Sequence, residues 1–193
     1  MKCTATAALL ALAPCLAAAD MVRYELDASH TAVYFTIDHI GYAKTLGIFE
    51  ELSGAFMFDP DSRALGDVRV EIDAASINTF NRARDRHVRN ADFLHVSSHP
   101  EITFVANGGT ARTAQSGRVR GELTILGQTQ PVTLDVTLNK EAPYPFGHGR
   151  EVLGLSITAE IDRSDFGMTY GVANGLVGDT VTINIETEAM RMD

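Results

Sequence analysis

Residues 132–138 read Val-Thr-Leu-Asp-Val-Thr-Leu, with an apolar side chain at every second position and a polar one between. Successive side chains of an extended chain point to opposite faces, so this alternation is typical of a β-strand with one buried and one solvated face. The same period of two recurs at residues 22–26, 33–37, 54–58, 68–72, 102–104, 119–125, 153–161 and 181–185. Strands with a single apolar face normally belong to antiparallel sheets, so we expect an all-β fold.

Turn-forming sequences separate these strands. Asp59-Pro60-Asp61, Asn107-Gly108-Gly109 and residues 127–131 predict tight reversals, and residues 139–150 predict a longer loop because they contain prolines and glycines. Eight or nine amphipathic strands must bury their apolar faces together, in a sandwich or in a closed barrel. The even recurrence of strands favours an up-and-down barrel, because closure removes exposed edges.

Residues 78–95 break this rhythm. They are rich in Asn, Arg, Asp and His, and they predict one or two short helical turns and a loop. Arg82, Arg84, Arg86 and Arg89 form a basic island there. Charge runs are usually solvated faces, so the favoured interpretation is a connector whose arginines pair with Asp85 and Asp92.

The composition excludes several classes of partner and of site. The chain has 193 residues and a formal net charge of −9, which indicates one globular domain with an acidic surface. An acidic surface argues against a nucleic-acid partner, and also against electrostatic adhesion to anionic membranes. Both cysteines, Cys3 and Cys15, lie close to the N-terminus, so the rest of the chain has no disulfide and no thiolate metal site.

Residues 1–19 are expected to be a signal peptide. Lys2, the apolar run 7–16 and three alanines ending at Ala19 follow the order of an export signal, with cleavage after Ala19 and a mature domain of residues 20–193. The apolar run is shorter than the ~20 residues that span a bilayer, so no stable membrane insertion is expected. Acylation of Cys15 remains an alternative, although Pro14 stands where such sites have a small residue.

Two groups of polar residues invite a catalytic or metal interpretation. Asp27, Ser29 and His30 contain the residue types of a hydrolase triad, but their adjacency in one turn makes the required geometry poor. His95-x-x-x-His99 has a spacing that zinc permits, but it lies in an expected loop without a cysteine partner. We therefore predict neither catalytic residues nor a metal site.

Several longer motifs stand in a characteristic order along the chain. They are Leu26-Asp27-Ala28-Ser29-His30-Thr31, Ile72-Asp73-Ala74-Ala75-Ser76-Ile77-Asn78-Thr79, Arg84-Asp85-x-His87-Val88-Arg89-x-Ala91-Asp92-Phe93, Gly121-x-Leu123-Thr124-Ile125 and Ile161-Asp162-Arg163-Ser164-x-Phe166-Gly167-Met168. In this order and spacing the whole mature chain resembles the YceI-like, or polyisoprenoid-binding, family. Tyr24 departs from the family's frequent Trp, and Tyr42, Ala43, Gln128 and Gln130 are further departures.

The resemblance implies a lipocalin-like, eight-stranded antiparallel β-barrel with a short helical connector. It implies a carrier or reservoir in the periplasm of a Gram-negative bacterium, which holds a long polyisoprenoid lipid with a quinone-type or phosphorylated head group, without catalytic residues or cofactor. Inward-facing side chains are then the expected lipid contacts: Val33, Phe35, Ile37, His39, Phe49, Phe56, Ile72, Phe104, Leu123, Ile125, Leu134, Leu155, Ile157, Phe166 and Ile183. His39 continues the inward parity of its strand, so it either meets the head group at the barrel mouth or is a partly buried histidine bonded to a carbonyl.

Other interpretations stay open at this point. Small barrels are often packed solid, so alternation alone favours a filled core over a cavity, and the resemblance reverses that preference. A filled barrel fits a stress-related periplasmic module that acts through its surface, and polar residues converging on a cavity fit an enzyme that acts on a small amphiphile through His39 or His87. Arg163 and Asp162 are expected to fix a loop through a buried ion pair. The oligomeric state is open, and a homodimer is compatible with the sequence.

Overall fold

The computed structural model describes residues 20–192, so the expected signal peptide and Cys15 lie outside the described residues. The elements in chain order are β1 (Val22–Leu26), η1 (Ala28–His30), β2 (Ala32–His39), β3 (Ala43–Phe49), β4 (Leu52–Phe58), β5 (Leu65–Asp73), η2 (Ala74–Ser76), β6 (Ile77–Asn78), α1 (Arg82–Val88), β7 (Glu101–Ala106), β8 (Thr110–Thr113), β9 (Ser116–Ile125), β10 (Gln128–Pro143), β11 (Glu151–Asp162), η3 (Arg163–Phe166) and β12 (Val177–Met192).

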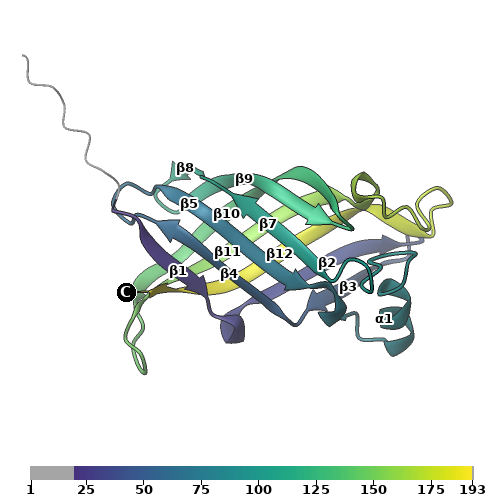
Figure 1. Cartoon of the computed structure of the whole chain (residues 1–193), viewed down its shortest axis with the longest axis horizontal. Helices are drawn as coiled ribbons and strands as arrows, with labels where there is room; N and C mark the ends of the chain where they lie inside the picture. Colours follow the sequence, from purple (N-terminus) through teal and green to yellow (C-terminus); the bar gives the residue numbers. More distant parts are fainter. Residues whose placement is uncertain (1–19, 193) are drawn as a thin grey trace, which may run out of the picture.

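Eight of the strands close into a barrel. The strands β1, β4, β5, β7, β9, β10, β11 and β12 pair in that order, and β1 pairs back with β12. Each of these pairings is antiparallel. The expected all-β, eight-stranded antiparallel barrel is therefore confirmed (Figure 1).

One end of the barrel is extended by the remaining strands. The C-terminal half of β12 pairs with β1, whereas its N-terminal half pairs with β2. The wall continues from β2 to β3 and from β3 to the two-residue strand β6. Helix α1 lies beside this extension, at the right-hand end of Figure 1. In residues 20–192, no helix is both long enough and apolar enough to cross a bilayer.

The connector contains the expected short helix. Asn81 caps α1 by accepting hydrogen bonds from the backbone of Ala83 and Arg84. The expected ion pairs of the arginines are wrong: Asp85 accepts from Thr79, and Asp92 lies 3.0 Å from the His87 ring nitrogen. Thr79 offers both a backbone amide and a hydroxyl, so it satisfies the Asp85 carboxylate without an arginine.

The turn between β9 and β10 differs from the expected one. Leu126 and Gly127 both have positive φ, at 53° and 71°, and Ile125 pairs with Gln128. Two such residues form the tight hairpin turn whose twist matches the flanking strands. Pro131 therefore lies inside β10, opposite Glu122, and not in the turn.

A small aromatic cluster packs around Tyr24 in β1. The Tyr24 side chain is fully buried, its ring stacks on Phe56 with centroids 5.6 Å apart, and Phe58 meets it edge-on. Its hydroxyl is buried without a hydrogen-bond partner among the described residues. A buried hydroxyl without a partner loses its hydrogen bonds to water and destabilises the fold.

We expect Tyr24→Phe to raise the free energy of unfolding by about 1 kcal/mol, because it keeps the ring contacts and removes the unpartnered hydroxyl. Urea unfolding of a protein comprising residues 20–193 measures the change. Tyr34→Phe, on the half-exposed face of β2, is the control and should leave stability unchanged. A loss of stability in Tyr24→Phe would mean that the hydroxyl has a partner after all.

Candidate ligand-binding cavity

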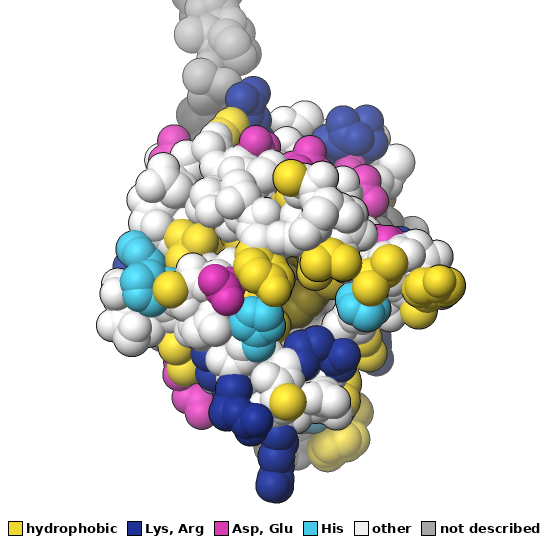
Figure 2. All heavy atoms as spheres, turned by 90° about the vertical axis from the view of Figure 1, so that its right-hand side faces the viewer, with side chains coloured by type: hydrophobic (Ala, Val, Ile, Leu, Met, Phe, Trp, Pro, Cys, Tyr) yellow, Lys and Arg dark blue, Asp and Glu magenta, His cyan; other side chains and the backbone are white. Residues whose placement is uncertain are grey.

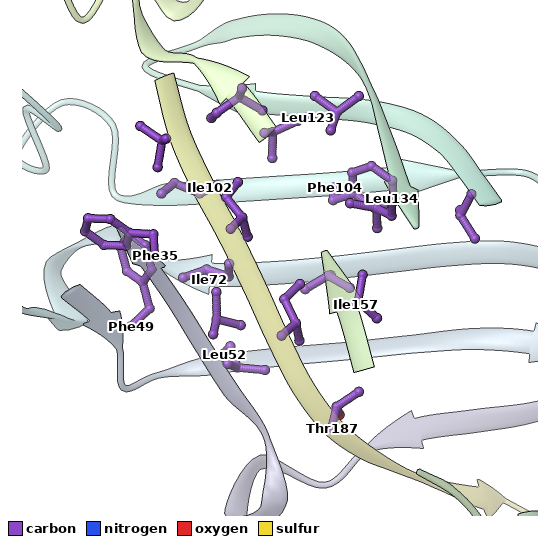
Figure 3. Close-up of a pocket in the computed structure, with 18 of the residues that line it drawn as sticks. Phe35, Phe49, Leu52, Ile72, Ile102, Phe104, Leu123, Leu134, Ile157 and Thr187 are labelled. Carbon is purple, nitrogen blue, oxygen red and sulfur yellow. The ribbon is translucent and has the colours of Figure 1, made fainter. Parts of the chain in front are cut away.

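A cavity of about 670 Å³ runs along the barrel interior. This volume falls within the roughly 300–1,000 Å³ that is typical of small-molecule sites. Its wall is almost wholly apolar. Figure 3 shows side chains from several strands directed into one space, among them Phe35, Ile72, Leu134 and Ile157.

Partial exposure of the inward-facing side chains shows that the barrel is hollow. Phe35, Ile37, Leu134, Ile157 and Ile183 line the cavity, yet each remains half-buried instead of fully buried. In a solid barrel such residues would be sealed against their neighbours, because protein cores pack to crystal-like density. The interior is therefore a lined cavity and not a filled core.

The predicted lipid contacts converge on this cavity with one exception. The residues that line it are Val33, Phe35, Ile37, His39, Phe49, Phe56, Ile72, Phe104, Leu123, Ile125, Leu134, Leu155, Ile157 and Ile183. Phe166 does not line it: this side chain is buried in the core at η3, beside a separate shallow depression. The role of the lining residues as lipid contacts stays a prediction.

Several lining residues were not among the predicted contacts. Leu52, Val70 and Ile102 line the cavity from strands whose alternation already indicated the inward face, so the signal was present. Met168, Tyr170 and Leu176 line it from the loop between η3 and β12, where no periodic pattern gives a direction.

Two glycines keep the bore open. Phe35 lies opposite Gly47 across the β2–β3 pair, and its ring occupies the space where a Cβ of that glycine would stand. The Phe104 ring covers Gly121 of β9 in the same way. Both rings therefore lie against the wall, whereas a side chain at either glycine would push the ring into the cavity.

Polar groups gather at the end of the cavity beside α1, which we call the mouth. Thr79, Arg84 and His87 line it there, together with His39, which is exposed and not partly buried. Arg84 donates from Nε to the Thr79 hydroxyl at 2.9 Å, and that hydroxyl donates to Asp85 at 2.5 Å. Burial alone would raise the pKa of Asp85, but hydrogen bonds from Thr79 and the nearby Arg89 and Arg84 hold it below its ordinary value. The mouth thus offers the N–H donors of Arg84, His87 and His39, and the ionised carboxylate of Asp85 lies behind Thr79.

Arg163 builds the loop that covers one side of the mouth. Its side chain is 2 % exposed, and its guanidinium donates to the carbonyls of Gly178, Met168, Tyr170 and Val177 at 2.7–3.0 Å. Burial lowers the pKa of Arg163, and Asp179 opposes this effect. The expected buried ion pair with Asp162 is wrong, because Asp162 is exposed and accepts from Thr180. Arg163 fixes the loop through backbone carbonyls instead.

The Asp27, Ser29 and His30 cluster does not have the geometry of a hydrolase triad. Asp27 Oδ2 and Ser29 Oγ both lie against the same ring nitrogen, His30 Nδ1, at 2.7 and 3.1 Å, and Ser29 donates its proton to Asp27. A triad needs the serine on one ring nitrogen and the carboxylate on the other. Asp27 and His30, together with Glu188, form a group with ligand atoms within 4.8 Å of one another, which is close enough to hold a cation.

The same cluster predicts a window of pH-dependent stability. Hydrogen bonds from Ser29 and His30 lower the pKa of Asp27 from 3.8 to about 2, so its contribution is present above pH 3.8 and is lost as the pH falls towards 2. The hydrogen bond to Asp27 raises the pKa of His30 above 6.5, so its contribution is present below pH 6.5 and is lost as the pH rises through the raised pKa.

We therefore expect His30→Gln to lower the unfolding midpoint most between about pH 4 and 6.5, with a difference that fades in alkaline solution. Thermal unfolding of both proteins across this range measures it. The exposed His148, in the loop between β10 and β11, supplies His148→Gln as the control for the loss of a histidine as such. A deficit of His30→Gln that persists unchanged at alkaline pH would contradict the assignment.

Comparisons with known proteins show which family shares this sequence and architecture. The YceI-like domain model matches residues 24–189. A UPF0312 protein of Pectobacterium carotovorum is 31% identical over 169 residues, which cover 88% of this chain and 85% of that protein. The crystal structure of a Campylobacter jejuni YceI protein superposes with a TM-score of 0.74 at 30% identity and covers 81% of this chain and 90% of its own. A polyisoprenoid-binding domain from Saccharophagus degradans has the same fold, with a TM-score of 0.65 at 16% identity, and covers 89% of this chain and 99% of its own.

Proposed function

The chain belongs to the YceI-like family, and from this membership we propose that it is a carrier or reservoir that binds a polyisoprenoid lipid inside its barrel. The observation that carries the proposal is the shape of the cavity, which has a long apolar bore with polar side chains towards its ends, at the mouth beside α1 and, with Arg63, Gln115 and Arg118, at the β8–β9 end. A long apolar chain fits the bore, and a polar head group at its end would meet polar side chains where the bore ends. The solved domain from Saccharophagus degradans, described as polyisoprenoid-binding, has the same fold and supports the choice of lipid.

The mouth residues match the head group of such a lipid. Arg84, His87 and His39 offer N–H donors at the cavity end, and a prenyl quinone or a prenyl phosphate presents only oxygen acceptors to them. The bore itself offers almost no hydrogen bonds, so the prenyl chain is held by apolar contact. We propose no catalytic role, because the polar groups stand towards the ends of the cavity and the wall of the bore between them is almost wholly hydrocarbon.

The free energy of moving a lipid from a membrane into the barrel suits a protein that must also release its lipid. Burying a five-carbon unit is worth about 4 kcal/mol relative to water, at ~0.8 kcal/mol per carbon. A polyisoprenoid starts in a membrane, however, so entering the barrel exchanges one apolar surrounding for another. The net free energy of transfer is then small, and selectivity comes from cavity length and from the head-group contacts.

The proposed compartment is the periplasm. The charge and apolar pattern of residues 1–19 supports export, and sequencing of the exported protein should find Asp20 as its first residue. An exported lipid carrier of this kind would move or store lipid between membranes without itself spanning one.

Tryptophan fluorescence can test the binding, because the chain contains no tryptophan. Phe49→Trp places a reporter on the cavity wall, and Val105→Trp places one on the exposed outer face of β7. Titration of delipidated protein with a prenyl quinone should quench the inner reporter saturably at one lipid per chain and leave the outer reporter nearly unchanged. Equal, unsaturable quenching of both reporters would contradict binding inside the barrel.

A further inference from the structure

Exposed apolar side chains surround the mouth of the cavity. Ile40, Tyr42, Phe80, Tyr170 and Leu176 are all exposed, with Tyr42 at 90% and Phe80 at 66%, and we call them the collar. They come from the β2–β3 turn, the residues before α1 and the loop before β12, which meet at the right-hand end of Figure 1. Figure 2 looks onto this end and shows hydrophobic side chains around a hollow.

Two of these side chains belong to residues with strained backbone angles. Ile40 and Phe80 have φ of 55° and 63°, in the left-handed region that β-branched and bulky residues avoid. Ile40 stands in a hairpin turn, followed by Gly41 at φ 71°, where Asn or Gly is the usual residue. Strained positions persist where the structure uses them, and here both present an apolar side chain to the outside.

The collar is continuous with the cavity wall. Ile40, Tyr170 and Leu176 are exposed and also line the cavity. An apolar surface therefore runs from outside the protein into the bore. A lipid that enters from water would not need this continuity, whereas a lipid that enters from a bilayer would cross the mouth without exposing its chain.

Segment 78–95 beside the mouth carries a charge opposite to that of the whole chain. Residues 78–95 carry four arginines against two aspartates, although the formal net charge of the chain is −9. Arg82 and Arg86 on α1 are exposed and make no ion pair with the described residues, and Figure 2 shows Lys and Arg side chains gathered below the hollow. Screening limits electrostatic interactions to about 10 Å in ordinary salt, so these arginines act on a surface that touches the mouth, whatever the total charge.

From these observations we propose that the collar docks the mouth onto a phospholipid bilayer, with its apolar side chains in the interface and Arg82 and Arg86 on lipid phosphates. This proposal rests on the proposed function, because the docked mouth would let a polyisoprenoid pass between the bilayer and the bore. Docking is peripheral and reversible, because five side chains and two charges fall far short of a spanning segment. The net negative charge of the chain argues against electrostatic adhesion to an anionic membrane. At the mouth this expectation does not hold, because Arg82 and Arg86 lie beside the apolar side chains of the collar.

Vesicle flotation tests the docking without any polyisoprenoid. The mature protein should float with vesicles of phosphatidylcholine and phosphatidylglycerol. The variant Tyr42→Ser/Phe80→Ser should bind about tenfold less, since it removes the two most exposed aromatic side chains of the collar. The variant Arg82→Gln/Arg86→Gln should lose about fivefold per arginine on these vesicles and little on pure phosphatidylcholine.

Matched controls lie away from the mouth. Phe146 is 70% exposed in the loop between β10 and β11, at the opposite end of the barrel, and Arg120 is exposed on β9. Phe146→Ser and Arg120→Gln should leave flotation unchanged. Equal losses in the control and collar variants would overturn the proposal, as would a collar that instead joins two copies, seen as a dimer that Tyr42→Ser/Phe80→Ser converts to monomer without change in flotation.

The tryptophan titration with solubilised quinone separates this proposal from the proposed function. If quinone still binds the Phe49→Trp reporter while the protein never floats, docking is wrong and the carrier function stands. If vesicles bind and no quinone enters the barrel, the carrier function is wrong, and docking no longer has the purpose on which it rests.

Discussion

Ile157→Trp is expected to weaken polyisoprenoid binding by about 30-fold, or about 2 kcal/mol, while the protein stays folded. Ile157 points into the bore from β11 and remains half-buried, so an indole at this position would occupy space that the proposed lipid chain fills (Figure 3). In a solid core an added ring typically costs about 1–3 kcal/mol of stability, whereas a hollow barrel can accept it. The tryptophan titration of the lipid and urea unfolding measure the two effects separately.

Thr158→Trp provides the matched control for this plug. Thr158 is the next residue of β11 and is exposed on the outer face, so the same indole is added on the other side of the wall. It should bind the lipid as the native chain does. Both variants add a fluorescent indole. Their affinity is therefore measured by competition with a labelled lipid whose signal the indole does not affect. Unchanged affinity in Ile157→Trp would contradict a binding site in the bore.

Arg163→Met is expected to lower the free energy of unfolding by about 4 kcal/mol, because it leaves several buried carbonyls without a donor. The guanidinium reaches four carbonyls of the segment 168–178 at once, and its Cζ also lies over the Phe93 ring, 5.8 Å from the ring centroid. Methionine fills part of the volume but donates no hydrogen bond. Chemical unfolding measures the loss, and hydrogen exchange should show the 168–178 amides exchanging faster.

Arg163→Lys distinguishes the charge of the guanidinium from its geometry. Lysine keeps the positive charge, but it cannot spread its donors over four carbonyls, so about half of the lost stability should return. Full recovery would mean that charge alone matters, and a loss below about 1 kcal/mol in Arg163→Met would contradict the role of Arg163 in holding the loop.

The barrel could be predicted from the sequence because its signal is local. Alternation along residues 132–138 and their counterparts shows which side chains share a face, and this directs Phe35, Leu123 and Ile157 inward. The pattern stops where β11 ends at Asp162 and η3 begins, so nothing in the sequence gives a direction to Phe166, which is buried in the core at η3 and does not line the bore.

Other features depend on properties that a local pattern does not carry. A hollow bore and a solid one have the same alternation, because the difference lies in the volume that all strands enclose together. The partners of Arg163 are backbone carbonyls, which every residue has, so its sequence neighbours suggested a carboxylate instead. The collar was missed because Ile40, Phe80 and Tyr170 come from three separate connectors that only the fold brings together.

The most direct test of the central claim is mass spectrometry of an organic extract from the purified protein. The proposed function predicts one prenyl quinone or prenyl phosphate per chain, depleted in Ile157→Trp and retained in Thr158→Trp. The mass of the lipid would give its chain length and head group. A clean extract from the native chain, together with no uptake of added prenyl lipids, would contradict the carrier function and leave a hollow barrel that works through its surface.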